Sequence, residues 1–393
     1  MIPYARQSID QADIAAVVEV LQSDWLTQGP LVERFEQAIA QHCGAGFGVA
    51  VCNATAGLHL ACLAAGLGEG DWLWTSPISF VASANCGRYC GAGVDFVDID
   101  PQTWTIDAGA LALKLEQAAR QGRLPKVVVA VAFAGQSADM RTIAGLARQY
   151  GFTLIEDAAH AVGARYAGAA VGCGEFADMT VFSFHPVKII TTGEGGMVVT
   201  NRAALDQRLR LLRSHGVTRD AGQMTEDSHG PWYYQQLELG FNYRITELQA
   251  ALGLSQLARL DVFLARRRTL AARYQRLLAP LPVSVQAPQA DAESAWHLFV
   301  VRLQGDRIQR SHREVFDGMR AAGVGVNLHY IPIHLQPYYR DLGFKPGDFP
   351  QAEAYYAEAL SLPMYPDLTD AQQDFVIDTL RGLLELPVGS AHG

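Results

Sequence analysis

The sequence lacks the features that mark membrane, secreted and nucleic-acid-binding proteins. No apolar run approaches the roughly 18 residues that a membrane-spanning helix needs, and the first residues do not follow the basic-then-apolar order of a signal peptide. Only 18% of residues are charged, the net charge is -9, and no run of five basic residues occurs. Such a charge does not attract nucleic acid or an anionic membrane. We therefore expect a cytoplasmic protein with no nucleic-acid or membrane partner.

Cysteine is also scarce, and its pattern argues against a metal site. The chain has six cysteines, all in its first half and inside apolar stretches, with no Cys-x-x-Cys pair. They are Cys43, Cys52, Cys62, Cys86, Cys90 and Cys173. We expect buried, reduced thiols and no bound metal.

What the chain does have is an alternation of short β-branched runs with helical patterns, over about residues 48 to 213. The runs lie at 48–52, 94–97, 126–133, 152–156, 179–184 and 196–200. Runs of this kind predict the buried strands of a mostly parallel sheet flanked by helices. The predicted fold class is therefore α/β.

The rest of the chain predicts a second, smaller unit. A long helical pattern follows Asn242, and the arginines at 266–268 are interpreted as its solvated face. Strand-like runs at 295–301 and 324–330 then alternate with helical patterns at 311–322, 351–360 and 370–384. We predict a large domain over residues 1–255, which includes an N-terminal arm, and a small C-terminal α+β domain over residues 256–393.

Lys188 says most about chemistry, because it sits in a strand-turn run, Ser183-Phe-His-Pro-Val-Lys188, among apolar neighbours. A buried amine loses its proton more readily, and only a neutral amine attacks an aldehyde to form a Schiff base. This is the chemistry of pyridoxal phosphate. Ser183, at the strand end, is a candidate phosphate ligand, although serine in a turn often bonds its own backbone.

Asp157 ends the strand-like run 152–156 and is followed by Ala-Ala-His160. Ligands bind at the carboxyl ends of parallel strands, and a carboxylate there can keep a pyridine nitrogen protonated. The alternative is that Asp157 caps the following helix. His160 can contact the same ring, or it can be an ordinary structural histidine.

Three further positions are candidates for ligand contacts. Asn53-Ala-Thr-Ala-Gly57 follows a strand and opens a helical pattern, a geometry that binds phosphate, although an N-cap at Asn53 or Thr55 explains it equally well. Phe80 can lie on a pyridine ring, or it can belong to the core. Arg244 is predicted to begin a helix, where a cation opposes the helix dipole, which favours an anionic substrate over a surface salt bridge.

Taken together, several ordered motifs resemble the DegT/DnrJ/EryC1/StrS family of fold-type I, pyridoxal-phosphate-dependent nucleotide-sugar aminotransferases. The motifs are Asp157-Ala-Ala-His-Ala, Ser183-Phe-His-Pro-Val-Lys188, Glu194-Gly-Gly, Arg213-Ser-His-Gly216 and Gly240-Phe-Asn-Tyr-Arg-Ile-Thr-Glu-Leu-Gln-Ala-Ala. The resemblance covers essentially the whole chain.

The resemblance implies roles for particular residues. Lys188 would form the Schiff base, Asp157 would pair with the ring nitrogen, and Phe80 and His160 would bracket the ring. Ala54, Thr55, Ala56 and Ser183 would hold the phosphate, joined by Asn242 from the neighbouring subunit of a homodimer. Contacts to the sugar nucleotide would come from Tyr4, Trp25, Leu26, Thr27, Arg244, His329, Tyr330 and Tyr338.

Within the family, Thr75-Ser-Pro-Ile-Ser-Phe-Val-Ala-Ser-Ala-Asn85, Gly230-Pro-Trp-Tyr-Tyr234 and His329-Tyr-Ile-Pro-Ile-His334 most resemble the 4-aminotransferase of pseudaminic acid biosynthesis. The implied substrates are L-glutamate and a UDP-4-keto-6-deoxy-N-acetyl-hexosamine. The alternatives are an aminotransferase for another 4-keto or 3-keto nucleotide sugar, or a pyridoxal phosphate sugar dehydratase. Related 3-dehydratases carry histidine in place of the lysine, so Lys188 argues against that branch.

Overall fold

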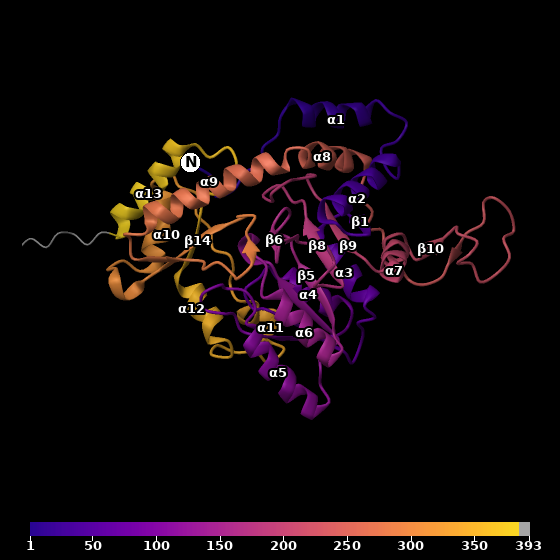
Figure 1. Cartoon of the computed structure of the whole chain (residues 1–393), viewed down its shortest axis with the longest axis horizontal. Helices are drawn as coiled ribbons and strands as arrows, with labels where there is room; N and C mark the ends of the chain where they lie inside the picture. Colours follow the sequence, from indigo (N-terminus) through magenta and orange to yellow (C-terminus); the bar gives the residue numbers. More distant parts are fainter. Residues whose placement is uncertain (385–393) are drawn as a thin grey trace, which may run out of the picture.

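The computed structural model describes residues 1–384, and its main feature is a seven-stranded sheet (Figure 1). Its strands are β1 (Phe47–Val51), β2 (Trp72–Thr75), β3 (Gly93–Phe96), β4 (Val127–Val131), β5 (Thr153–Asp157), β8 (Met179–Ser183) and β9 (Gly196–Thr200). They lie in the order β1-β9-β8-β5-β4-β2-β3. Only β9 runs antiparallel to its neighbours, β1 and β8, so the predicted α/β class with a mostly parallel sheet is confirmed.

Helices cover both faces of this sheet. They are α2 (Pro30–Cys43), α3 (Ala54–Ala64), α4 (Ala82–Tyr89), α5 (Ala108–Gln121), α6 (Met140–Tyr150), α7 (Ala203–Arg213) and α8 (Glu247–Leu257). Val127 and Val129 of β4 belong to the core under α3 and α4, whereas Val128 and Ala130 belong to the core under α5 and α6. Because alternate side chains of a strand point to opposite faces, burial of both faces explains why β4 is apolar throughout.

The ends of α5 and α6 follow directly from the sequence. Asp107 and Asp139 precede these helices, and the carboxylate of each accepts backbone N–H groups of the first turn. Gly122 and Gly151 end the same helices with φ of 65° and 78°. Glycine adopts this left-handed conformation without a steric penalty, so both helices stop where the glycine stands.

The C-terminal part of the chain forms a second, smaller sheet packed against helices, on the left of Figure 1. Its elements are α9 (Leu260–Leu278), β12 (Val283–Val285), β14 (Phe299–Leu303), α10 (His312–Ala321), α12 (Pro350–Glu358), β15 (Ala359–Leu362) and α13 (Asp370–Leu384). The three strands form an antiparallel sheet in the order β12-β14-β15, and α9, α10 and α13 pack with it around a core of their own. The α+β character predicted for this part is confirmed. The boundary near residue 255 stays a prediction.

Three expectations about local structure were wrong. The predicted strand at 324–330 is not a strand: Ile2 takes the place of a partner strand and exchanges hydrogen bonds with Gly323 and Gly325 on either side of Val324. Strand β2 was missed, because its four residues include only one β-branched residue, Thr75, and β-branched runs marked the other strands. Arg244 does not begin a helix, since α8 starts at Glu247 with Thr246 as its N-cap.

The arginines at 266–268 are also not a solvated face throughout. Arg267 is 0% exposed, and its guanidinium donates to the backbone carbonyls of Trp296, His297 and Met364. Burial lowers the pKa of Arg267 to about 9. The charge pattern of the sequence suggested solvent contact, but the helix uses this arginine to tie the C-terminal part to the segment before β14.

The remaining elements are short or peripheral. They are α1 (Gln11–Leu21), β6 (Arg165–Tyr166), β7 (Ala169–Ala170), β10 (Val217–Thr218), β11 (Gln235–Gln236), β13 (Ala292–Glu293), α11 (Pro337–Arg340) and the 3₁₀ turns Phe133–Gly135, Gly305–Arg307 and Ile333–Leu335. Strands β10 and β11 close a long arm that projects from the sheet on the right of Figure 1. Trp232 in this arm is 72% exposed. Over residues 1–384, no helix combines the length and apolarity needed to cross a membrane.

Candidate active site

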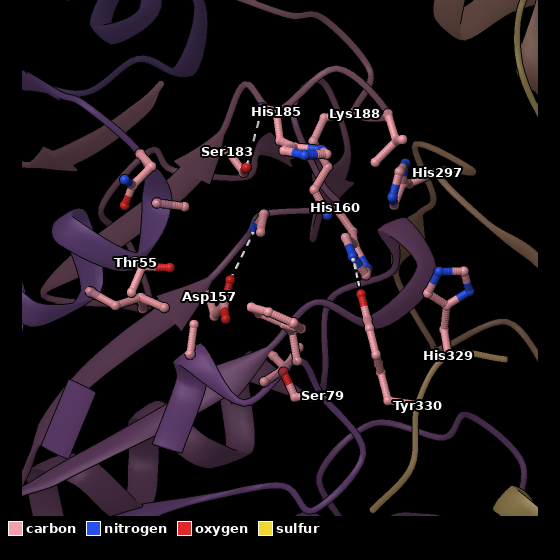
Figure 2. Close-up of a pocket in the computed structure, with 18 of the residues that line it drawn as sticks. Thr55, Ser79, Asp157, His160, Ser183, His185, Lys188, His297, His329 and Tyr330 are labelled. Carbon is pink, nitrogen blue, oxygen red and sulfur yellow. Dashed lines mark hydrogen bonds between the residues drawn. The ribbon is translucent and has the colours of Figure 1, made fainter. Parts of the chain in front are cut away.

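A cavity of about 450 Å³ opens where the carboxyl ends of β4, β5 and β8 meet the first turn of α3 (Figure 2). We call it the Lys188 cavity. It is lined by Tyr4, Asn53, Ala54, Thr55, Leu58, Ser79, Phe80, Ala82, Val131, Asp157, Ala159, His160, Ser183, His185, Val187, Lys188, Glu194, His297, His329 and Tyr330. These residues come from both the sheet part and the C-terminal part, so the fold brings together positions more than 300 residues apart.

Lys188 lies in the turn after β8, where its backbone N–H donates to the carbonyl of His185 at 2.8 Å. Its side chain reaches the cavity, where burial lowers the pKa of its amine to about 8, and the Asp157 carboxylate opposes this shift. A lysine with this pKa keeps a sizeable neutral fraction near neutral pH. Lys188 can therefore act as a nucleophile or as a base.

Asp157 is the last residue of β5 and is held by a chain of hydroxyl groups from the next layer. Ser83 Oγ donates to Asp157 Oδ2 at 2.6 Å, and Ser79 Oγ lies 2.6 Å from Ser83 Oγ. Burial raises the pKa of Asp157, while Ser83, the backbone N–H of Ala159 and Lys188 oppose the rise. The Ala159 bond closes a turn and no helix follows before β6, so the alternative that Asp157 caps a following helix is wrong. The carboxylate is oriented and can face a cationic ring nitrogen.

The first turn of α3 faces the same cavity. Ala54 and Thr55 line it, whereas Ala56 is buried and its N–H donates to the Asn53 side chain at 2.9 Å. Asn53 is thus an N-cap, as one alternative proposed. Gly196 packs so closely that a Cβ there would lie 2.7 Å from the Ala54 nitrogen. Ser183 ends β8 beside this turn, and its Oγ accepts the His185 N–H at 3.4 Å.

Three histidines form the wall opposite to α3 (Figure 2). Burial lowers the pKa of His160 and of His297 well below the usual value, with Lys188 and neighbouring histidines acting in the same direction. Burial, together with the nearby Lys188, lowers the pKa of His329 to about 3. All three rings are therefore neutral. His297 was missed from the sequence, where it stands between Trp296 and Leu298 without any motif to mark it.

Phe80 lies at the mouth of the cavity rather than in the core. It is 58% exposed, and its ring centroid is 6.2 Å from that of Tyr330. An aromatic side chain left this exposed beside a cavity is free to cover a flat ligand.

The structure leaves seven of the predicted site residues outside the Lys188 cavity: Trp25, Leu26, Thr27, Ala56, Asn242, Arg244 and Tyr338. Arg244 lines a second cavity of about 470 Å³, which we call the Arg244 cavity, together with Gln28, Gly29, Glu36, Arg210 and Arg213. Thr27 pairs with Thr246 close to it, and Asn242 pairs with Ser214. Tyr338 lies elsewhere, where it accepts a hydrogen bond from Arg88 at 3.2 Å.

The residues of the Lys188 cavity fit pyridoxal phosphate. They supply an amine with a lowered pKa, a buried carboxylate across from it, and a helix N-terminus that Gly196 leaves open on the same wall. Lys188 can hold the aldehyde carbon, Asp157 the ring nitrogen, and Ala54, Thr55 and Ser183 the phosphate. Over residues 1–384 there is no group of three or more His, Cys, Asp or Glu side chains arranged to hold a metal ion.

Comparisons with known proteins agree with this arrangement. Residues 7–381 match the model of the DegT/DnrJ/EryC1/StrS aminotransferase family. The chain is 39% identical to the spore coat polysaccharide biosynthesis protein SpsC of Bacillus subtilis, over 98% of this chain and 97% of that protein.

Among solved structures, PseC of Helicobacter pylori, an aminotransferase involved in the biosynthesis of pseudaminic acid, matches with a TM-score of 0.88 at 29% identity, over 98% of this chain and 99% of that one. The sugar aminotransferase Spr1654 of Streptococcus pneumoniae in its pyridoxamine form gives the same score, identity and coverage, and it has also been solved in its pyridoxal phosphate form.

Proposed function

Because the chain belongs to the DegT/DnrJ/EryC1/StrS aminotransferase family and is a pyridoxal-phosphate-dependent sugar aminotransferase, we propose that it moves the amino group of L-glutamate to C4 of a UDP-4-keto-6-deoxy-N-acetyl-hexosamine. The product would be UDP-4-amino-4,6-dideoxy-N-acetyl-β-L-altrosamine, an intermediate for pseudaminic acid. The family, the fold type and the cofactor expected from the sequence are confirmed. The amino donor, the sugar and the site of amination are our proposal.

The observation that carries the proposed chemistry is the Lys188 amine, with its pKa of about 8, in one cavity with the buried Asp157 carboxylate. When bound, pyridoxal phosphate supplies an electron sink that makes the hydrogen next to an amine acidic. Lys188 Nζ would take that proton from the α-carbon of glutamate and deliver it to the former aldehyde carbon of the cofactor. Asp157 would keep a proton on the ring nitrogen, which strengthens the electron sink.

The other walls of the cavity support binding. The N–H groups of Ala54 and Thr55 in the first turn of α3 and the hydroxyl group of Ser183 would hold the phosphate. The three neutral histidines form a polar wall that places no charge beside Lys188. Phe80, His160 and Tyr4 would enclose the ring and the hexose, which keeps water away from the reacting carbon.

We also propose that the protein acts as a homodimer with shared sites. Residues Trp25, Leu26, Thr27, Asn242 and Arg244 gather near the Arg244 cavity, outside the Lys188 cavity of their own chain. If these residues serve the substrate, a neighbouring subunit must present them. The exposed arm closed by β10 and β11, with Trp232 on its surface, offers a second contact of this kind.

One comparison favours a different keto sugar as the alternative substrate. The identity to SpsC, 39%, is higher than the 29% identity to PseC. SpsC belongs to spore coat polysaccharide biosynthesis, so a different 4-keto or 3-keto nucleotide sugar of a surface polysaccharide is the alternative. A sugar dehydratase is less well supported, because Lys188 stands where the related 3-dehydratases carry histidine.

The test begins with the purified holoenzyme. Glutamate should bleach the visible absorbance band of the bound cofactor, and after removal of glutamate, UDP-2-acetamido-2,6-dideoxy-β-L-arabino-hexos-4-ulose should restore it. If glutamate bleaches the band and only another keto sugar restores it, the aminotransferase activity stands and the proposed substrate is wrong. If glutamate leaves the band unchanged, the proposed donor is wrong.

A further inference from the structure

The hydrogen-bonding pattern of His160 fixes which of its ring nitrogens carries the proton. The backbone N–H of Ala134 donates to His160 Nδ1 at 3.3 Å. A backbone N–H can only donate, so Nδ1 must offer a lone pair. Since burial and the nearby Lys188 keep the ring neutral, the single ring proton sits on Nε2.

This assignment sets the direction of the next hydrogen bond. His160 Nε2 lies 3.2 Å from the hydroxyl oxygen of Tyr330, and the two rings are nearly parallel, at 19°. Because Nε2 carries the proton, it donates and the Tyr330 oxygen accepts. The hydrogen of the Tyr330 hydroxyl group is then free to be donated elsewhere.

Within residues 1–384, His160 is the only hydrogen-bond partner of the Tyr330 hydroxyl group. Burial and the nearby Asp157 carboxylate raise the pKa of Tyr330, so this hydroxyl group keeps its proton throughout the working pH range. Tyr330 lines the same cavity as Asp157 and Lys188. The cavity therefore contains a directed hydrogen-bond donor that is available to a ligand.

The position of the other groups identifies that ligand atom. Figure 2 shows Thr55 and Ser183 on one side of Asp157 and Lys188, and His160 and Tyr330 on the other. In pyridoxal phosphate, the phosphate arm and the ring oxygen likewise lie on opposite sides of the line from the ring nitrogen to the aldehyde carbon. With the nitrogen at Asp157, the aldehyde carbon at Lys188 and the phosphate at Thr55 and Ser183, the ring oxygen faces Tyr330.

We propose that the Tyr330 hydroxyl group donates a hydrogen bond to the ring oxygen of pyridoxal phosphate, and that His160 is a positioning residue that orients this donor. This inference rests on the proposed placement of the cofactor, and it moves Tyr330 from the predicted sugar contacts to the cofactor contacts.

The test uses the visible absorbance band of the holoenzyme, without sugar or amino donor, followed as a function of pH. A hydrogen bond to the ring oxygen stabilises the negative charge on that oxygen. The effect is largest above the pH midpoint, where the neighbouring nitrogen has lost the proton that otherwise shares this charge. Tyr330→Phe should therefore raise the pH midpoint of the band by about one unit, a tenfold change in the equilibrium. Tyr166→Phe, which removes a hydroxyl group that donates to Asp139 outside this cavity, should leave the midpoint unchanged.

A second replacement tests the same bond with the opposite sign. 3-Fluorotyrosine at position 330 keeps the shape of the side chain but is a stronger donor, so it should lower the midpoint. His160→Phe should raise the midpoint less than Tyr330→Phe does, and the double variant should shift no further than Tyr330→Phe alone.

Two results would overturn the inference. One is a wild-type midpoint with 3-fluorotyrosine at position 330 or with a folded Tyr330→Phe variant. The other is a full His160→Phe shift that persists when Tyr330 is already phenylalanine, because His160 would then contact the ring oxygen itself. A shifted midpoint in an enzyme that does not turn over the proposed sugar would support this inference and remove only the proposed substrate.

Discussion

The Lys188 cavity and the Arg244 cavity have nearly the same volume, about 450 and 470 Å³. Their charged groups differ, because the buried carboxylate of the Arg244 cavity is paired with two arginines, whereas the lysine of the Lys188 cavity is not paired in the described part of the chain. In the Arg244 cavity, Glu36 is bound by Arg210 at 2.7 Å and by Arg213 at 2.5 Å. In the Lys188 cavity, the lysine amine has no carboxylate within 4 Å among residues 1–384, and its pKa is lowered. The volumes of the two cavities therefore do not distinguish them. They differ in that the Lys188 cavity keeps its buried amine available for a ligand, whereas the buried Glu36 is already bound.

The two helix N-termini at these cavities show the same contrast. The first N–H groups of a helix have no partner inside the helix. At α2, those of Leu31 and Val32 donate to the Glu247 carboxylate, each at 2.9 Å. At α3, the first turn opens on the Lys188 cavity through Ala54 and Thr55. At α2 a carboxylate of the protein itself occupies the anion site, whereas at α3 the uncharged Asn53 side chain takes only the Ala56 N–H and the rest of the turn faces the cavity.

Removal of the Lys188 amine should have the largest effect on activity, because it abolishes the feature that separates the two cavities. We expect Lys188→Ala to lower turnover by more than about 10³-fold, because it removes both the nucleophile and the base. The measurement is the rate at which glutamate bleaches the cofactor band in a single turnover. Lys126→Ala, which removes a surface lysine paired with Asp71 at 2.8 Å, is the matched control and should react like wild type. A Lys188→Ala variant with wild-type transamination would contradict the role of the Lys188 cavity.

Removal of the Asp157 carboxylate, across from the Lys188 amine, should have the second-largest effect. Asp157→Ala removes a charge-assisted hydrogen bond, and such bonds contribute about 1.5–3 kcal/mol, so pyridoxal phosphate should bind about 10- to 100-fold more weakly. Equilibrium dialysis of the apoenzyme measures this affinity. Asp139→Ala is the control, because Asp139 caps α6 outside the cavity. It should lower the melting temperature without changing the affinity, and equal affinities for the two variants would argue against the role of Asp157.

The sequence predicted the Lys188 cavity better than the Arg244 cavity, and the reason is topological. Asp157, Ser183 and the first turn of α3 all stand at ends of strands or at the start of a helix, positions that an α/β sheet brings to one edge. Tyr4, His329 and Tyr330 required the family resemblance, because the C-terminal part is placed against the sheet by tertiary packing. The N-terminal segment that pairs with Val324 has no signal in a single sequence.

Other features could not be predicted because their causes are three-dimensional. His297 and Ser83 lack any motif of their own, and only the folded chain shows that one lines the cavity and the other holds Asp157. Arg267 carries a charge in a charged stretch, so its burial contradicts its local sequence. The assignment of Arg244 to a substrate site was read from a helix start that the structure places three residues later.

The lowered pKa of Lys188 predicts that the rate of cofactor uptake in the Lys188 cavity depends on pH. This effect should be smaller than that of Asp157→Ala and larger than that of Arg244→Ala. Below a pKa of about 8 the amine is protonated and cannot attack the cofactor aldehyde. The neutral fraction rises with pH, so the rate at which the apoenzyme takes up pyridoxal phosphate should increase about tenfold from pH 7 to pH 9. Stopped-flow absorbance follows this uptake. A rate that falls or stays level over this range would mean that the lysine amine is already neutral, or is not the attacking group.

The smallest effect should come from Arg244, and it would show whether the two cavities act together. Arg244→Ala should lower kcat/KM for the sugar nucleotide by only about fivefold, since a rim charge contributes about 1 kcal/mol. Mixed with inactive Lys188→Ala subunits, it should regain activity if Arg244 of one subunit serves the Lys188 cavity of the other. After random exchange, about a quarter of all sites would be intact. No gain over the unmixed variant would mean that Arg244 acts within its own chain, or not at all, and that the Arg244 cavity is not part of a shared site.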